Sequence, residues 1–256
     1  KTKNRPINNP LICHFANIRE IEKNFVLKDK DYELANTFWP GPLTLILEKN
    51  IESLISPLLS NNRYHVGCRI PSNEMRLSLL SILDFPIAAP SANIATRTSI
   101  TSIKDLDNKL KEIFYIDGGS SVLGLESTVV QTTKNGCKIL RLGSLTIEDI
   151  KIKFPKYEIS IEQSNVSPGN QLKHYSPIKP IRINVDFVKK NEALLNFGIN
   201  ELTSDIKSLN LSIEENLSDA SYNFYNYLNI LDSINCSGIA VAPIPDQGLG
   251  KTINDR

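Results

Sequence analysis

Basic and hydrogen-bonding side chains gather in the first fourteen residues of the chain. Lys1, Lys3 and Arg5 precede two prolines, and Asn9 and His14 follow at short spacing. Because proline fixes φ and biases the residue before it towards extended geometry, these side chains stand on a stiff, non-helical segment. Arginine offers a planar fork to phosphate oxygens and lysine adds a mobile charge, so the stretch suits a polyanion such as a nucleoside triphosphate. An ordinary solvated basic terminus explains the same residues equally well.

Further polar side chains stand where predicted strands and turns end. A predicted strand over 64–71 brings Arg69 to its end, which in an α/β sheet is where ligands usually bind. The turn Ser91-Ala92-Asn93 exposes backbone N–H groups and short side chains that can hold a phosphate or a carboxylate. Ser127 begins another strand, and Arg141 ends the one after it. Each position also has a simpler interpretation, as a surface residue, a plain turn or a residue chosen for β-propensity.

Hydrophobic periodicity and turn residues predict alternating strands and helices that would hold these side chains. The turn Lys134-Asn135-Gly136 predicts a hairpin between 129–132 and 137–140. Asn17 and Glu20 form a capping pattern for a helix over 18–26. Other strands are predicted over 11–14, 43–47, 85–90, 113–116, 181–185, 193–197 and 238–243, and other helices over 31–38, 74–83, 103–111, from Thr146, and from Ser218 or Asp219 to about Asp232.

Composition and charge bound the class of protein. A chain of 256 residues with 41% hydrophobic and 22% charged residues is typical of a globular protein, and a net charge of +1 excludes the global basic field of a general nucleic-acid binder. The four cysteines form no C-x-x-C pair and the three histidines lie far apart, so no metal site is predicted. No apolar run approaches the roughly 20 residues that span a bilayer, and no signal peptide stands at the start, so a cytoplasmic location is expected.

Breaker residues divide the chain. Few periodic apolar positions and several Gly and Pro residues occur over 164–177. We therefore predict a first domain over 1–161, a linker over 162–180 that crosses the site with Lys173, His174 and Tyr175, and a small α/β domain over 181–256. The basic motif has no element before it and the helix that Gly248 opens stops at once, so we expect the sequence to be truncated at both ends.

Separate motifs occur in one order along the chain, and each alone is short. The ordered set resembles the two-domain L-threonylcarbamoyladenylate synthase family, the longer YrdC-type proteins, closely over about 1–180 and more loosely beyond. The motifs are Lys3-Asn-Arg5-Pro6, Asn9-Pro-Leu-Ile-Cys-His14, Trp39-Pro-Gly-Pro-Leu-Thr44, Val66-Gly-Cys-Arg69-Ile-Pro71, Ala89-Pro-Ser91-Ala-Asn93, Glu126-Ser127-Thr128, Arg141-Leu-Gly143 and Ser167-Pro-Gly followed by Lys173-His174-Tyr175-Ser-Pro177.

The resemblance implies a fold and a reaction. The expected fold is α/β: a YrdC-like twisted open mixed sheet with flanking helices, followed by a small Rossmann-like α/β domain. The expected enzyme is a nucleotidyltransferase that converts L-threonine, bicarbonate or CO2, and ATP into threonylcarbamoyl-AMP and pyrophosphate. The product would feed the tRNA threonylcarbamoyl transferase machinery. The enzyme would need no membrane and no stable contact with nucleic acid.

Site residues follow from the same resemblance. Lys3 and Arg5 would be the catalytic cations, and no protein metal ligand is implied because Mg²⁺ would be carried by the triphosphate. The residues implied to face ATP are Lys3, Arg5, Asn9, His65, Asn93, Thr101, Arg141 and Tyr175. Those implied to bind L-threonine are His14, Arg69, Ser91 and Ser127.

The sequence also departs from the family pattern. His65 and Gly67 are non-standard in their strand, Ala95-Thr96 replaces the usual Ser-Gly, and Leu142 stands between Arg141 and Gly143 where proline is usual. A Thr-x-Tyr-Gly element that helps to bind threonine is absent. Two rivals stay open: a non-catalytic RNA-binding YrdC-like module, and a carbamoyl-transfer domain of hydrogenase maturation, whose usual zinc-finger and acylphosphatase-like regions are not found.

Overall fold

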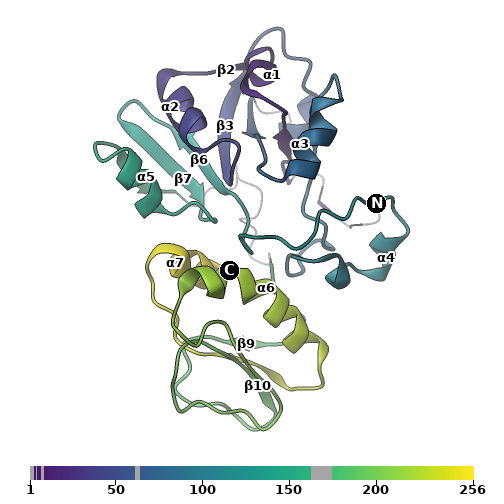
Figure 1. Ribbon diagram of the computed structural model, residues 1–256, viewed down its shortest axis with the longest axis vertical. Helices are drawn as coiled ribbons and strands as arrows, with labels where there is room; N and C mark the ends of the chain where they lie inside the picture. The colour runs from purple at the N-terminus through teal and green to yellow at the C-terminus, as the bar shows by residue number, and fades with distance from the viewer. Residues whose placement is uncertain (1–2, 4, 7–8, 61–63, 163–174) are drawn as a thin grey trace. The chain divides into compact units, whose positions relative to one another are not determined.

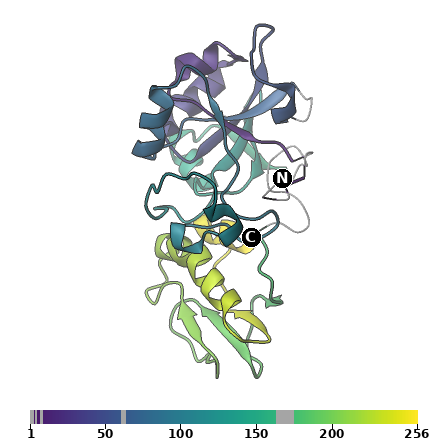
Figure 2. The same cartoon turned by 90° about the vertical axis from the view of Figure 1, so that its right-hand side faces the viewer.

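The computed structural model describes residues 3, 5–6, 9–60, 64–162 and 175–256 (Figures 1 and 2). The chain divides into two compact units, each built around one sheet. The large-sheet unit comprises Arg5–Pro90 and Glu126–Leu172, and the small-sheet unit comprises Lys1–Asn4, Ser91–Leu125 and Lys173–Arg256. The predicted boundaries at 161 and 181 stay predictions, and most of the predicted linker lies outside the described residues.

The large-sheet unit holds eight strands in the order β5-β1-β4-β3-β6-β7-β8, with β2 added alongside β3. Parallel and antiparallel neighbours alternate along it, which confirms the mixed sheet. The strands are β1 Ile12–His14, β2 Phe25–Val26, β3 Leu43–Lys49, β4 His65–Arg69, β5 Ile87–Ala88, β6 Thr128–Thr132, β7 Gly136–Arg141 and β8 Glu158–Ile161.

Helices flank the large sheet, and β3 forms the centre of its core. Leu43, Leu45 and Leu47 on one face and Thr44 and Ile46 on the other are all buried, as expected of a central strand covered on both faces. Figure 1 shows α2 close to β3 and α5 close to β7. The helices of this unit are α1 Ile18–Glu22, α2 Asp29–Phe38, α3 Glu74–Ser81 and α5 Ile147–Lys153, with a 3-10 turn at Pro57–Ser60.

Caps explain where these helices begin. The Asn17 side chain accepts from the Glu20 backbone N–H, and Thr146 forms a capping box with Asp149, both as predicted. The predicted end of the first helix at residue 26 is wrong. Phe25 and Val26 pair instead with the end of β3, so the helix stops at Glu22. The Asn73 side chain caps α3 by accepting from the Arg76 backbone N–H.

The small-sheet unit holds a four-stranded parallel sheet, which confirms the predicted second α/β fold. Its order is β11-β10-β12-β9, with β9 Ile181–Arg182, β10 Glu192–Asn196, β11 Ser208–Asn210 and β12 Gly238–Val241. The helix α6 (Leu217–Ser233) packs on β10 and β12 and is followed by α7 (Gly248–Asp255). Figure 1 shows both helices beside the green strands of this sheet. Asn216, not Ser218 or Asp219, caps α6.

The segment over 101–116 differs from the prediction. A 3-10 turn at Ile103–Asp105 and the four-residue α4 (Asn108–Lys111) replace one helix, because Ser102 and Asp107 each cap a separate turn. The strand predicted over 113–116 is wrong: these residues form no strand and Phe114 is fully exposed. Within the described part of the chain, no helix combines the length and the apolar character that a membrane crossing demands.

Candidate functional site

His14 and Arg69 lie side by side at the edge of the large sheet that is formed by the carboxyl ends of its strands β1 and β4. They are the last residues of the parallel strands β1 and β4, and they are partners in the register of that pair. Because α3 begins at Glu74, its first turn lies near the same edge, as ligand sites of α/β sheets usually do. The Arg69 Nε donates to the Gly41 carbonyl oxygen at 2.9 Å, which fixes the guanidinium. His14 is only 5% exposed.

The charges at this edge suit an anion. Burial lowers the pKa of His14 to about 3, and the charges of Arg76 and then Arg69 act in the same direction, so the imidazole is neutral at pH 7. Burial, followed by the charges of Arg76 and Arg141, lowers the pKa of Arg69 to about 10, which still leaves it charged. Like charges held together in this way favour the binding of a carboxylate or a phosphate.

His14 also has an unused hydrogen-bonding atom. Its Nδ1 is buried and has no hydrogen-bond partner among the residues that the structure describes. An unpaired buried nitrogen costs free energy, and such groups in native proteins usually have a functional explanation. A ligand at this edge that pairs with Nδ1 would remove the cost.

The burial of neutral His14 predicts a loss of stability in mild acid. The unfolded chain takes up a proton at this histidine below about pH 6.5, whereas the folded chain does so only near pH 3, so stability falls as the pH falls between these values. The free energy of unfolding is expected to fall by about 2 kcal/mol between pH 7.5 and pH 5 through this residue alone. Urea titrations at several pH values of the wild type and His14→Gln measure it. A pH dependence equal in the two proteins would contradict the assignment, and His65→Gln controls for the loss of an imidazole.

Ser127 is held by the two strands on either side of β6. The Arg141 guanidinium donates to the Ser127 carbonyl oxygen from Nη2 at 2.8 Å and from Nε at 3.2 Å, and to the Ser127 Oγ from Nη2 at 3.1 Å. The Thr44 Oγ1 lies 2.8 Å from the same Oγ. All three residues are buried. The hydroxyl of Ser127 therefore has a fixed position beside a buried cation.

Gly143 allows the backbone around Ser127, just before β6, to lie close to the chain that follows β7. A Cβ at residue 143 would meet the Thr128 nitrogen at 2.4 Å and the Glu126 carbonyl oxygen at 2.5 Å. Both contacts are with backbone atoms, which cannot rotate away. Ser144 N–H, next along, donates to the Glu126 carbonyl oxygen at 2.8 Å. Only glycine therefore fits this position without moving Ser127.

Removing the Thr44 hydroxyl tests whether the fixed Ser127 matters for binding. If Ser127 contacts L-threonine, as the family resemblance implies, Thr44→Val is expected to weaken L-threonine binding by about 5- to 10-fold, because it keeps the shape of the side chain but loses one hydrogen bond. Calorimetric titration with L-threonine measures the change, and Thr44→Ser, which keeps the hydroxyl, is the matched control. Equal affinities of Thr44→Val and the wild type would show that this hydrogen bond does not position Ser127 for the ligand.

The other residues of this unit that were predicted to bind ATP lie apart from His14 and Arg69 in their hydrogen bonds or in their position along the strand. Arg5 donates from Nη2 to the Pro10 carbonyl oxygen at 2.8 Å, and the buried Asn9 accepts more weakly through its own carbonyl at 3.4 Å. His65 is exposed and begins β4. It lies about 13 Å along the strand from Arg69, given a rise of about 3.3 Å per residue. The structure therefore does not bring His65 to the edge that holds Arg69.

In the small-sheet unit, Lys3 lies against the turn at Ser91. Its ammonium group donates to the carbonyl oxygens of Ser91 and Asn93, and its own carbonyl accepts from the Ala95 N–H at 3.0 Å. The Asn93 Nδ2 donates to the Arg97 carbonyl oxygen at 2.6 Å, whereas its buried Oδ1 has no hydrogen-bond partner among the described residues. The structure thus brings together three residues that the sequence predicted for ligand binding.

Thr101 and Tyr175 also lie in the small-sheet unit. The Thr101 carbonyl accepts from the Ser121 N–H at 2.8 Å. Tyr175 has a φ of 58° and is 5% exposed, with its ring 6.1 Å from that of Tyr225 and the Arg256 guanidinium 5.0 Å from its centre. These contacts make Tyr175 part of the core of its unit. A role in contact with ATP stays a prediction for both residues.

Two residues near the site were missed by sequence reasoning. Thr44 lies inside one of the motifs, but only the pairing of β3 with β6 shows that its hydroxyl meets Ser127. Arg76 resembles any cation on an exposed helix, and no sequence signal marked it. Its charge lowers the pKa of both His14 and Arg69, which places it among the cations that act on this part of the sheet.

Comparisons with known proteins identify related families and proteins over the whole chain. A family model described as "Telomere recombination" matches residues 1–143, and one described as "Threonylcarbamoyl-AMP synthase, C-terminal domain" matches residues 145–256. A Bacillus subtilis protein named threonylcarbamoyl-AMP synthase is 30% identical over 280 residues, an alignment that covers all of this chain and 80% of that protein. A protein of the same name from Pyrococcus abyssi is 36% identical over 189 residues, which cover 69% of this chain.

A solved structure is similar as well. The crystal structure of P. abyssi Sua5 complexed with L-threonine matches with a TM-score of 0.83 and 28% identity, over 99% of this chain and 80% of that one. The sequence match to the Pyrococcus protein spans only 54% of its length, and that to the Schizosaccharomyces pombe relative spans 55%.

Proposed function

The chain belongs to the threonylcarbamoyl-AMP synthase family, and from this premise we propose that it is a nucleotidyltransferase that makes threonylcarbamoyl-AMP. Its substrates would be L-threonine, bicarbonate or CO2, and ATP. The observation that supports this most is the group of His14, Arg69 and Ser127, in which His14 and Ser127 are buried and Arg69 is partly buried. It offers a fixed cation and two neutral hydrogen-bonding groups. L-Threonine carries a carboxylate, an ammonium group and a hydroxyl, and could use all three.

The proposed reaction needs positioning rather than a protein nucleophile. The threonine nitrogen attacks the carbon of CO2, or of bicarbonate with loss of water, and gives a carbamate. A carbamate oxygen then attacks the α-phosphorus of ATP, and the bond to the leaving pyrophosphate breaks. Binding the reactants together and neutralising the charge on phosphate supply most of the acceleration in such transfers.

The predicted residues divide the work by their chemistry. Arg69 would hold the threonine carboxylate, with Arg76 as a second cation nearby, while His14, Ser91 and Ser127 would contact the rest of the amino acid or its carbamate. Lys3, Arg5 and Arg141 would neutralise phosphate charge. Cations that interact more strongly with the transition state than with bound ATP accelerate the transfer. The set proposed to contact ATP elsewhere is Asn9, His65, Asn93, Thr101 and Tyr175.

Magnesium would enter with the nucleotide. Among the described residues, no group of three or more His, Cys, Asp or Glu side chains is placed to hold a metal ion, and the predicted site is rich in cations instead. Such a donor set does not suit a hard divalent cation bound by the protein. We therefore write Mg²⁺ as part of the MgATP substrate. The tRNA threonylcarbamoyl transferase machinery as consumer of the product, and a cytoplasmic location, stay predictions from the sequence.

Pyrophosphate release tests the proposal. The protein is mixed with ATP, Mg²⁺, L-threonine and bicarbonate, and three parallel reactions each omit one of ATP, threonine and bicarbonate. Release that needs all three supports the synthase. Salt-dependent binding of RNA without any pyrophosphate release would instead favour the non-catalytic RNA-binding module. The match of residues 145–256 to a threonylcarbamoyl-AMP synthase domain argues against the hydrogenase-maturation rival.

A further inference from the structure

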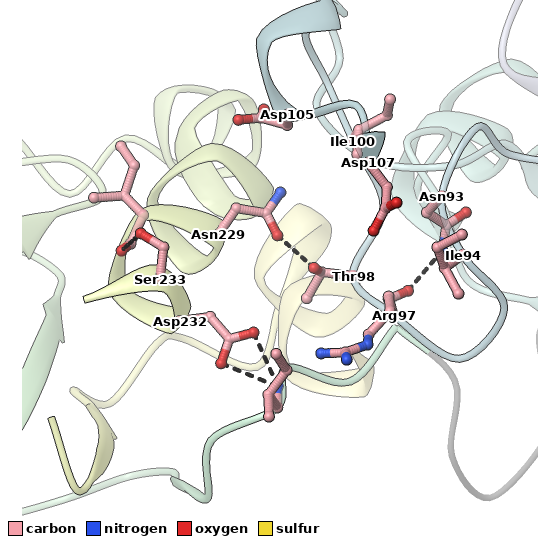
Figure 3. A pocket seen from close by; sticks show the side chains of 12 residues that line it. Asn93, Ile94, Arg97, Thr98, Ile100, Asp105, Asp107, Asn229, Asp232 and Ser233 are labelled. Carbon is pink, nitrogen blue, oxygen red and sulfur yellow. Dashed lines mark hydrogen bonds between the residues drawn. The ribbon is translucent and has the colours of Figure 1, made fainter. Parts of the chain in front are cut away.

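The small-sheet unit contains a cavity of about 430 Å³. It lies between the segment over 93–107 and the C-terminal half of α6 (Figure 3), and Ile178 also lines it. Every lining residue belongs to this unit. Asn93, at the rim of the lining segment, is also among the residues proposed to contact ATP, but none belongs to the group of His14, Arg69, Ser127 and Arg141. A volume of this size is within the range of small-molecule sites.

Much of the wall is aliphatic, and several of its polar groups are already paired. Ile94, Ile100, Ile178 and Ile230 supply the apolar surface, and Ile178 is 69% exposed although it lines a hollow. Three sets of hydrogen bonds occupy the paired polar groups: Thr98 donates to the Asn229 Oδ1, the Asn229 Nδ2 donates to the Ser99 carbonyl, and the Asp232 carboxylate accepts from the N–H groups of Ile178 and Lys179.

Three charged side chains of the cavity have hydrogen-bonding atoms that could still pair with a ligand. Among the described residues, no hydrogen bond or ion pair involves the Arg97 guanidinium, and the buried Oδ2 of Asp105 has no hydrogen-bond partner. Asp107 uses Oδ1 to accept from the Lys109 N–H at 2.9 Å. Figure 3 shows the Arg97 guanidinium and the Asp107 carboxylate pointing into the same hollow. Burial raises the pKa of the Asp105 carboxyl, against the opposing charge of Lys104, because the carboxylate has lost water without gaining a donor.

We propose that this cavity binds a small zwitterion, namely an α-amino acid with an aliphatic side chain. The ammonium group of the ligand pairs with Asp105 and Asp107, its carboxylate pairs with Arg97, and its side chain packs on the isoleucines. Burial of an unpaired carboxylate oxygen is costly, and a cationic donor removes that cost.

The charges of the cavity disfavour two other kinds of small molecule, nucleoside triphosphates and uncharged apolar compounds. The cavity presents the carboxylates of Asp105, Asp107 and Asp232 against the single cation Arg97. A nucleoside triphosphate would meet three like charges here, so ATP does not suit this site. An uncharged apolar molecule would leave Asp105 and Arg97 without partners while removing them from water.

Calorimetric titration with L-isoleucine tests the inference. The wild type is expected to bind it, and Arg97→Met and the double variant Asp105→Asn with Asp107→Asn are each expected to weaken binding by at least about tenfold, since each removes a charged hydrogen-bond partner. N-Acetyl-L-isoleucine, which lacks the ammonium group, should bind the wild type far more weakly than L-isoleucine. Circular dichroism checks that each variant is folded.

A variant of the other site shows where the ligand binds. Arg69→Met is expected to leave the affinity for L-isoleucine unchanged. If Arg69→Met abolishes binding while Arg97→Met does not, the amino acid occupies the proposed threonine site and the inference is overturned. It is also overturned if the wild type gives no binding with L-isoleucine up to about 10 mM, which corresponds to less than about 3 kcal/mol of binding free energy.

Discussion

Replacement of Arg69 by methionine is expected to raise the dissociation constant for L-threonine by about 100-fold or more. The guanidinium is fixed by the Gly41 carbonyl and lies beside the buried His14, so water can replace it only poorly. Methionine keeps much of the length of the side chain but cannot pair with a carboxylate. The substitution removes the proposed charged hydrogen bond between the Arg69 guanidinium and the threonine carboxylate. The effect is therefore expected to be among the largest of any single substitution at the site.

Calorimetric titration of both proteins with L-threonine measures this effect. Arg19→Met, which removes an exposed cation from α1, is the matched control and should leave the affinity unchanged. An Arg69→Met protein that is folded and binds threonine within about threefold of the wild type, a difference below about 1 kcal/mol, would exclude Arg69 as the carboxylate partner.

Replacement of Gly143 by alanine is expected to abolish most pyrophosphate release and to lower the free energy of unfolding by about 2 kcal/mol or more. The added Cβ would lie 2.4 Å from the Thr128 nitrogen and 2.5 Å from the Ser127 carbonyl carbon, so the backbone of this strand must shift. Such a shift would move the Ser127 hydroxyl away from Arg141 and Thr44. Displacements of about 1 Å at a positioned group can cost about 100-fold in rate.

Gly119→Ala is the control for this variant. Gly119 has a φ of 78° and nothing within 4 Å of a Cβ, so alanine there meets only the backbone cost of about 1 kcal/mol. Urea unfolding gives the stabilities, and pyrophosphate release gives the activities. Wild-type activity in Gly143→Ala would show that the close packing around Ser127 is not required.

Local sequence signals predicted the elements that depend on neighbours in the chain. The turn at Lys134-Asn135-Gly136 indicated the hairpin of β6 and β7, and Thr146 with Asp149 indicated the start of α5. The apolar run at Leu43 indicated the central strand β3. These elements could be predicted because turns, helix caps and continuous apolar runs depend on the types of a few adjacent residues.

Elements that depend on distant partners were predicted less well. The β-branched and aromatic run over 113–116 has strand propensity, yet no strand pairs with it and its side chains are exposed. Val26 was assigned to a helix because periodicity cannot detect that β3 offers it a strand partner. β-Propensity reflects packing against neighbours, which the sequence of one segment does not contain.

The candidate site shows the same division. The ordered motifs placed Arg69, Ser127 and Arg141 among the functional residues, and the structure shows Arg141 bonded to Ser127. No motif revealed Arg76, whose role arises only when α3 is placed at the end of β4, nor the cavity at Arg97 and Asp105. Such groupings come from tertiary packing and had no signal in residue spacing.

Binding of L-threonine compared with L-threoninol, which has a hydroxymethyl group in place of the carboxylate, tests the central claim most directly. The claim is that the cations beside His14 hold the carboxylate of L-threonine. Calorimetric titration of the wild type should show L-threonine bound and L-threoninol bound at least about 100-fold more weakly, as the loss of a charged, buried pair predicts. Equal affinities for the two compounds, or no binding of L-threonine by the folded protein, would contradict the account.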